Sequence, residues 1–236
     1  MCFSAEASFG VAIALLPAGA YCMEAAWRKD RHYFLLAMVP IFFGIQQLCE
    51  ALVWLGIERA HPETVRVAAL TYLGIALAVW PVWIPLATAA LEPRVRRKRL
   101  LLALAGFGLL FGLVVYLPLA ANGGRGVDPT IIGHSIRYDL SVAPVISSFW
   151  WWGWLAVYLL AVSVPLIASR NHRLQPLGLA VVLCAIVSYL LFEYAFASVW
   201  CFFAAILSMY LTLVLHQAPG QNTENDEPQL QPIPSN

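Results

Sequence analysis

Residues 33–57 read YFLLAMVPIFFGIQQLCEALVWLGI, and this stretch determines the class of the fold. A transmembrane helix needs about 20 mainly apolar residues, so the stretch is long enough to cross a bilayer. Glu50 is its only charged residue. A carboxyl group inside a membrane span costs roughly 2.5–3.5 kcal/mol on insertion scales, so we expect Glu50 to face the protein interior and to have a partner there.

The composition of the whole chain agrees with a lipid environment. Of its 236 residues, 61% are hydrophobic and 11% are charged, whereas soluble domains carry about 25% charged residues. The formal net charge of +1 argues against a nucleic-acid partner. We therefore expect an integral membrane protein whose main partner is the lipid bilayer.

Apolar segments that can span a bilayer occur seven times along the chain. The last two form one run of about 42 residues, which as a single helix would be about 63 Å long and must therefore fold back. Ser198 can cap the returning helix, which predicts a tight turn at Phe196–Ser198. We expect an all-α, polytopic membrane bundle with one domain over residues 1–216 and spans near 6–27, 33–57, 67–91, 99–119, 144–168, 174–196 and 199–216.

The basic residues are divided unequally between the two ends of these spans. Ten follow the first, third and fifth spans, namely Arg28, Lys29, Arg31, Arg94, Arg96, Arg97, Lys98, Arg99, Arg170 and Arg173. Four lie at the other ends, namely Arg59, Arg66, Arg125 and Arg137. Because basic residues are retained in the cytoplasm, this asymmetry predicts an N-terminus outside and a C-terminus in the cytoplasm.

Two segments outside the spans differ in character. The outer loop, 120–143, contains an alternating pattern. Its apolar and ring-containing residues are Ile132, His134, Ile136, Tyr138 and Leu140, and the residues between them are Gly133, Ser135, Arg137 and Asp139. This alternation predicts an extended segment with one face on the mouth of the bundle, either as a lid or as a solvated loop. Residues 217–236 are polar and contain four prolines, which predicts a disordered cytoplasmic tail.

Rare polar residues are expected at one depth, in the outer third of the bundle. Gln46, Glu50 and Trp54 have the spacing i, i+4, i+8, which places them on one helix face, with Gln47 beside them. Further candidates come from the sixth and seventh spans and from the outer loop, namely Glu193, Trp200, His134 and Tyr138. Together these residues are the candidate lining of a ligand pocket open to the outer side.

Three interpretations of this set remain open. Glu50 could join helices through hydrogen bonds to neighbouring polar side chains, or it could anchor a ligand in the pocket. Glu50, His134 and Glu193 could also hold a metal ion, although catalytic zinc usually has more than one histidine ligand. Cys2 and Cys201 are expected on the oxidising side and form a candidate disulfide, which requires Cα atoms within about 7 Å. The sequence identifies no cofactor.

Five blocks of sequence resemble an uncharacterised family of bacterial multi-span membrane proteins. They are MCFSA (1–5) with Ala7-Ser8-Phe9, Gln46-Gln47 with Glu50 and Trp54, Val79-Trp80-Pro81, His134 with Ile136 and Tyr138, and SVWCFFAA (198–205). The blocks extend over nearly the whole chain. The family pattern reads Glu-Gly where Ala51 follows Glu50 here. The resemblance implies a multi-pass protein of the bacterial inner membrane, and it does not imply any particular activity.

The leading functional hypothesis is a binding or sensing protein for a small or lipid-derived ligand, with Glu50 as the buried anchor. The alternative is a membrane-embedded enzyme, metal-dependent in one version, in which Glu50 acts as a general base. The enzyme would need a nucleophile or a metal near Glu50, for which the sequence offers Cys201, Ser198 and His134 as candidates. A structural or partner subunit without a ligand is the third hypothesis.

Overall fold

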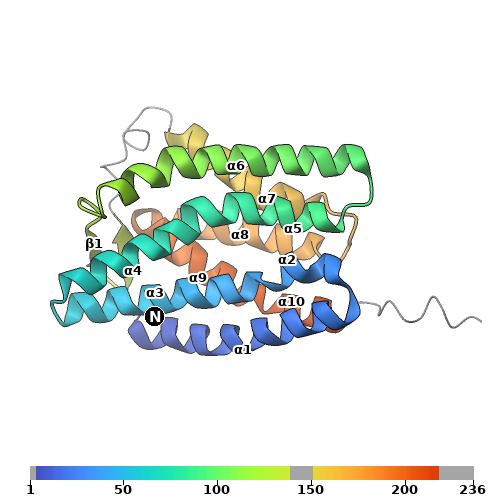
Figure 1. The fold of residues 1–236 in the computed structure, drawn as a ribbon. Helices are drawn as coiled ribbons and strands as arrows, with labels where there is room; N and C mark the ends of the chain where they lie inside the picture. The colour runs from blue at the N-terminus through green and yellow to red at the C-terminus, as the bar shows by residue number, and fades with distance from the viewer. Residues whose placement is uncertain (1–3, 139–150, 218–236) are drawn as a thin grey trace, which may run out of the picture.

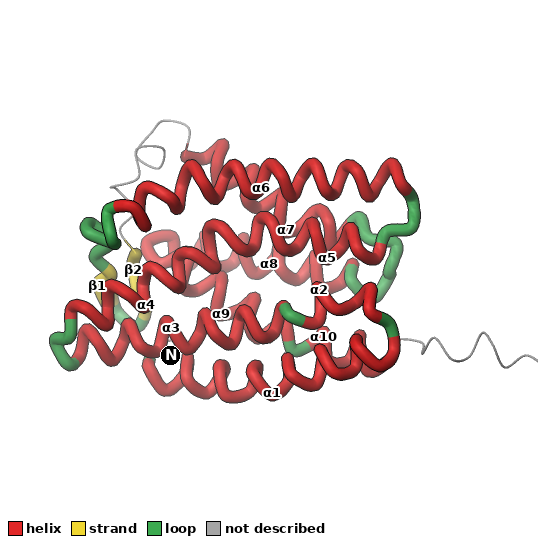
Figure 2. The backbone as a smooth tube through the Cα atoms, viewed as in Figure 1, coloured by secondary structure: helices red, strands yellow, loops and turns green. Residues whose placement is uncertain are grey.

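The computed structural model describes residues 4–138 and 151–217. Long helices lie side by side in a bundle, and a small β-hairpin lies at one end of it (Figure 1). Figure 2 shows that the loops between the helices gather at the two ends of the bundle. We call them the hairpin end, which carries the two strands, and the basic end, where the ten basic residues named above lie in turns and in the adjoining helix ends.

The first half of the chain forms antiparallel helices joined by short turns. These are α1 (Ala5–Lys29), a 3-10 turn (Arg31–Tyr33), α2 (Phe34–Ala37), α3 (Val39–Glu58), α4 (Pro62–Gly74), a π-helical segment (Ile75–Val79), α5 (Trp80–Leu91) and α6 (Val95–Ala121). Ser4 caps α1 by accepting a hydrogen bond from the backbone N–H of Ala7. α1 packs along α3, and α5 packs along α6.

The π-helical segment has a chemical cause. The N–H of Trp80 bonds to the carbonyl of Ile75, five residues earlier. The next residue is Pro81, which has no N–H to donate. The carbonyl of Ala76 therefore lacks a donor from its own helix, and the hydroxyl of Tyr158 supplies one at 2.6 Å.

The outer loop folds into a hairpin instead of one extended segment. β1 (Pro129–Ile132) pairs antiparallel with β2 (Ser135–Tyr138). The predicted alternation holds only for part of β2, where Ile136 is buried and Arg137 exposed but Ser135 is buried as well. It fails for Ile132 and His134, which are exposed because the chain reverses at Gly133 and His134, with Gly133 at φ +60°. Asp139 and Leu140 lie outside the described residues.

The second half contains the predicted reversal, at a slightly different place. Its helices are α7 (Trp151–Ile167), α8 (Gln175–Phe192), a 3-10 turn (Glu193–Ala195), α9 (Phe196–Ser208) and α10 (Tyr210–His216). The indole of Trp200 donates to the carbonyl of Val181 at 3.3 Å, whereas 19 residues of continuous helix would separate them by about 28 Å. The long apolar run therefore folds back on itself, as expected.

The turn lies at Glu193–Ala195, before the predicted Phe196–Ser198, and Ser198 is not a helix cap. The backbone leaves the helical region at Phe192 and again at Ala195, so α9 has already begun when the chain reaches Ser198. The Ser198 hydroxyl points into the bundle and bonds to Glu50 instead.

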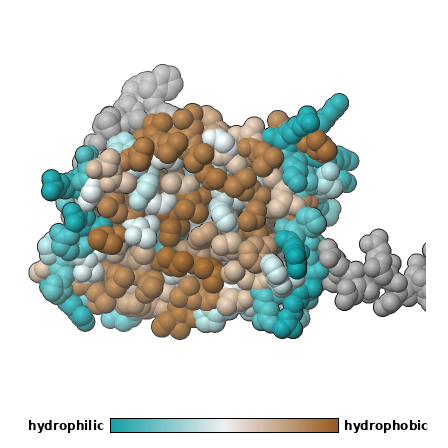
Figure 3. Space-filling model, in the orientation of Figure 1, coloured by the Kyte–Doolittle hydropathy of each residue, from teal (hydrophilic) through white to brown (hydrophobic). Residues whose placement is uncertain are grey.

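Five helical segments of the described chain are long and apolar enough to cross a membrane: Ala5–Lys29, Arg31–Glu58, Pro62–Leu91, Val95–Ala121 and Gln175–His216. The last of them contains the reversal between α8 and α9. Figure 3 shows hydrophobic residues over the middle of the visible face and hydrophilic residues at both ends. The chain is thus a mainly helical, multi-pass membrane protein of the all-α class. Residues 144–150 of the expected fifth span and 218–236 of the expected tail lie outside the described residues.

Glycine allows the closest contact between α5 and α6. A Cβ atom on Gly108 of α6 would overlap the backbone carbonyl of Pro81. Small residues let helix backbones approach in this way in membrane bundles. The contact holds the interrupted helix against α6 just beyond the π-helical segment.

Candidate functional site

Glu50 lies on α3 in the interior of the bundle and is only 1% exposed. Its carboxyl group accepts two hydrogen bonds, one from the Ser198 hydroxyl and one from Gln47 Nε2 at 3.0 Å. Ser198 belongs to α9, so the bond joins two helices that are far apart in the sequence. The expectation that Glu50 faces inward and has a partner is therefore confirmed.

The neighbouring residues of α3 are also buried. Gln46 accepts a hydrogen bond from the indole N–H of Trp80 at 2.9 Å. Gln47 Oε1 and Trp54 Nε1 are buried and have no hydrogen-bond partner within the described part of the chain. Most buried polar side-chain atoms are paired in proteins, so these two atoms mark a polar layer that can accept further partners.

Tyr138 of β2 reaches this layer from the hairpin. Its ring stacks on Tyr72 of α4, with centroids 4.8 Å apart and 10° between the ring planes. Burial raises the pKa of the Tyr138 phenol well above its usual value, and the negative charge of nearby Glu50 adds to the effect. Its hydroxyl is buried without a partner in the described chain. At neutral pH the phenol is therefore a protonated donor close to Glu50.

Three of the expected site residues lie apart from Glu50. His134 is exposed at the tip of the hairpin. Glu193 is exposed in the 3-10 turn, where it accepts a hydrogen bond from Tyr189 at 3.4 Å. Trp200 is buried, but its indole N–H points to Val181.

The candidate metal ligands are consequently separated. Glu50 is enclosed in the bundle, while His134 and Glu193 are in exposed turns. No three His, Cys, Asp or Glu side chains come together within residues 4–138 and 151–217. Cys201 is a buried free thiol, and Cys2 lies outside the described residues, so their candidate disulfide stays a prediction.

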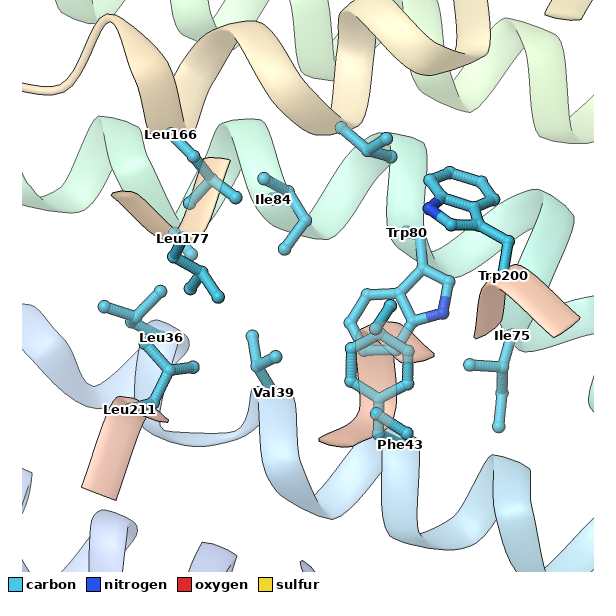
Figure 4. Packing of buried hydrophobic residues seen from close by; sticks show 14 of the residues in the cluster. Leu36, Val39, Phe43, Ile75, Trp80, Ile84, Leu166, Leu177, Trp200 and Leu211 are labelled. Carbon is cyan, nitrogen blue, oxygen red and sulfur yellow. The ribbon is translucent and has the colours of Figure 1, made fainter. Parts of the chain in front are cut away.

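Two cavities lie beside the Glu50 layer. The larger, about 160 Å³, is at the hairpin end, and Tyr138, Glu193 and Ala197 contribute to its lining. The smaller, about 50 Å³, lies deeper and is almost entirely apolar. Figure 4 shows aliphatic side chains of this deeper lining turned toward one another, namely Leu36, Val39, Ile84, Leu166, Leu177 and Leu211.

The two cavities share three lining residues, Tyr158, Trp200 and Cys201. Trp200 packs between aromatic neighbours, with its centroid 5.4 Å from that of Phe196 and 5.5 Å from that of Tyr158. The cavities therefore meet at Trp200. Both cavities are mainly apolar, but the one at the hairpin end also has polar groups in its lining, among them Tyr138 and Glu193. Glu50 lines neither cavity.

Three residues of this arrangement were not predicted. Tyr72 and Tyr158 each donate a hydrogen bond from the hydroxyl inside the bundle. Tyr72 donates to the carbonyl of Ala197 at 3.0 Å, and Tyr158 donates to the carbonyl of Ala76. For Ser198 the sequence predicts a helix cap or a candidate nucleophile, whereas the structure makes it the hydrogen-bond partner of Glu50. The available signal was the same in each case, a hydroxyl within an apolar segment, which needs a partner when lipid surrounds the helix.

The chain matches the model of a family described as "Family of unknown function (DUF6629)" over residues 1–226. It belongs to this family. The resemblance noted in the sequence is thereby confirmed. Searches of curated proteins and of solved structures found no match to the chain. The description of the DUF6629 family includes no activity, so only the geometry of the site points to a function.

Proposed function

We propose that this DUF6629 protein is a binding or sensing protein that holds a small, lipid-derived amphiphile in the two joined cavities. The observation that carries the proposal is the change in polarity along them. Tyr138 and Glu193 contribute polar groups at the hairpin end, while the inner cavity is lined by aliphatic and aromatic side chains. Ligand sites in proteins typically combine an apolar lining with a few placed polar groups.

The lining also favours a class of ligand. A single alkyl chain matches the narrow inner cavity, where the apolar surface of Trp80, Phe43 and Leu177 would cover it. The polar head would lie at the hairpin end, near the carboxylate of Glu193. A head group that donates hydrogen bonds, such as a hydroxyl or an amine, suits this carboxylate better than a phosphate would.

In this proposal Glu50 acts on the ligand through the wall of the site. It holds Ser198 of α9, and Cys201, three residues further on and close to one helical turn away, lines both cavities. The unpaired atoms of Gln47 and Trp54 lie in the same buried layer of α3. Removing the carboxyl group would therefore loosen the wall that α9 contributes.

We further propose seven spans in the bacterial inner membrane, with the N-terminus outside. Dividing the fifth apolar segment at its reversal gives two spans, of about 27 Å for α8 and about 31 Å for α9 with α10. α7 supplies the remaining one. The ten basic residues at one end favour a cytoplasmic location for that end, and the cavities then open toward the outer side.

A binding titration tests this function. Purified, delipidated protein is titrated with a single-chain amphiphile, monoolein, while tryptophan fluorescence is recorded, because Trp200 lies where the cavities meet. Cys201→Phe fills that junction, and Cys184→Phe is the matched control, since Cys184 is absent from both linings. We expect saturable binding to wild type and to Cys184→Phe, and at least tenfold weaker binding to Cys201→Phe. Equal binding by both variants would contradict the proposal.

A partner subunit without a ligand is the second candidate function. The enclosure of Glu50, with both of its hydrogen bonds made inside the protein, favours this candidate. Under it, wild type and both cysteine variants show no saturable binding of any single-chain amphiphile.

A further inference from the structure

A third cavity, of about 260 Å³, lies at the opposite, basic end of the bundle. Its lining comes from the end of α5, the start of α6 and the end of α7. Arg97 contributes to it from the first turn of α6, and Arg170 from the turn between α7 and α8. It is separate from the site proposed above, with which it shares no lining residue.

Neither Arg97 nor Arg170 has an ion pair or a side-chain hydrogen bond with any described residue, whereas some of the other basic residues of this end do. Arg28 pairs with Glu24, Arg31 lies over the ring of Trp27, and Arg173 donates to the carbonyl of Gln217. Two unpaired guanidinium groups in one cavity form a natural site for an anion.

Two further features affect the charge of the cavity. Glu92 is part of its lining and is 8% exposed; one of its oxygens accepts the backbone N–H of Arg94. This carboxylate offsets one of the two arginine charges. The first turn of α6 begins here without a side-chain cap, and its free N–H groups add positive potential. The net charge of the cavity lining is therefore positive.

The rest of the lining is apolar. Leu100, Leu101 and Leu104 of α6 and Val164 of α7 extend the cavity toward the middle of the bundle, and Leu100 is 70% exposed. Figure 3 shows how hydrophilic residues at this end give way to hydrophobic ones along the helices. A strip of positive charge followed by leucine side chains has the polarity of a phospholipid, with its phosphate at the end of the helices and its acyl chain along them.

We infer that this cavity binds an anionic phospholipid of the surrounding bilayer, with the phosphate between Arg97 and Arg170 and an acyl chain along Leu100, Leu104 and Val164. Basic pockets between transmembrane helices on the cytoplasmic side bind lipid head groups in this way. A lipid fits better than a free anion because the apolar part of the lining would otherwise remain exposed at the cavity. The inference does not depend on the function proposed for the other end.

The test is native mass spectrometry of delipidated protein with added phosphatidylglycerol, phosphatidylcholine or inorganic phosphate. The variant is Arg97→Gln with Arg170→Gln, and the control is Arg96→Gln with Arg99→Gln, which removes the same charge from residues outside the lining. A third variant, Arg97→Lys with Arg170→Lys, retains the charge. Thermal unfolding without lipid shows that each variant is folded. Each arginine near a membrane surface contributes about a factor of five, so we expect about 25-fold weaker phosphatidylglycerol binding in the lining variant.

The control should lose clearly less affinity for phosphatidylglycerol than the lining variant, because Arg96 and Arg99 do not line the cavity. The lysine variant should keep most of the affinity, because it keeps the charge. An equal loss in the lining variant and the control would overturn the inference, because the attraction would then be a property of the whole basic end. Equal binding of phosphatidylcholine would also overturn it. Equal occupancy by inorganic phosphate alone would show an anion site without a lipid, and would contradict the role given to the apolar lining.

Discussion

The hydroxyl of Ser198 on α9 donates a hydrogen bond to the carboxyl group of Glu50 on α3, although 148 residues separate them in the chain. This contact links the first part of the bundle to the last, and it lies one helical turn from Cys201, which lines both cavities of the proposed site. Glu50 therefore connects the stability of the bundle with the shape of the proposed site.

Glu50→Leu is expected to lower stability, because it leaves the Ser198 hydroxyl and Gln47 Nε2 without partners in the interior. An unpaired buried group costs about 1–3 kcal/mol, which predicts a clear fall in the thermal unfolding temperature in detergent. Glu50→Gln keeps an acceptor oxygen and should lose less. Glu193→Gln is the exposed control and should change little. Wild-type stability in Glu50→Leu would show that the carboxyl group has no such role.

Tyr158→Phe removes the donor to the carbonyl of Ala76 and is expected to cost about 1–3 kcal/mol, because that carbonyl has no donor from its own helix. Pro81→Ala restores a backbone N–H five residues after Ala76. In the Pro81→Ala background, Tyr158→Phe should therefore cost less. A double-mutant cycle measured by thermal or denaturant unfolding checks this coupling. Additive effects would contradict the explanation given for the π-helical segment.

Gly108→Ala is expected to destabilise the contact between α5 and α6 by about 1–3 kcal/mol, because the new Cβ would overlap the backbone of Pro81. Gly106→Ala is the matched control on the same helix, since a Cβ there meets nothing within 4 Å. Unfolding of both variants in detergent is compared with wild type. Equal stability of the two variants would mean that α5 and α6 are not packed as described.

The proposed orientation predicts which turns a membrane-impermeant maleimide can label in intact cells. In a Cys2→Ser background, Glu63→Cys at the hairpin end should react without permeabilisation. Lys98→Cys at the basic end should react only after the membrane is opened. Both positions are exposed, so a difference in labelling reports the side of the membrane. The reverse pattern would invert the orientation.

The fold could be predicted from the sequence to a large extent. Long apolar runs identify membrane helices because lipid leaves the backbone few alternatives. The fold-back of the last run followed from its length alone. The exact turn was missed because it has no glycine, proline or side-chain cap: Phe192 and Ala195 make it through their backbone angles. The hairpin was missed because alternation identifies strands and does not show where the chain reverses.

The candidate site was predicted in part. Periodicity placed Gln46, Glu50 and Trp54 in one buried layer because helix geometry fixes their common face. It could not show which distant residue meets that face, and the partner of Glu50 proved to be Ser198. The sequence correctly placed His134 and Glu193 at the hairpin end, but both lie in local turns that expose them. Depth in the membrane follows from sequence, whereas lateral position depends on how the helices pack.

The most direct test of the proposed function is native mass spectrometry of protein released from mild detergent without delipidation, for wild type, Cys201→Phe and Cys184→Phe side by side. We predict a retained adduct of lipid-like mass on wild type and on Cys184→Phe, and its loss from Cys201→Phe. An adduct of equal occupancy on all three proteins, or none on wild type, would contradict the claim that these cavities hold a lipid-derived ligand.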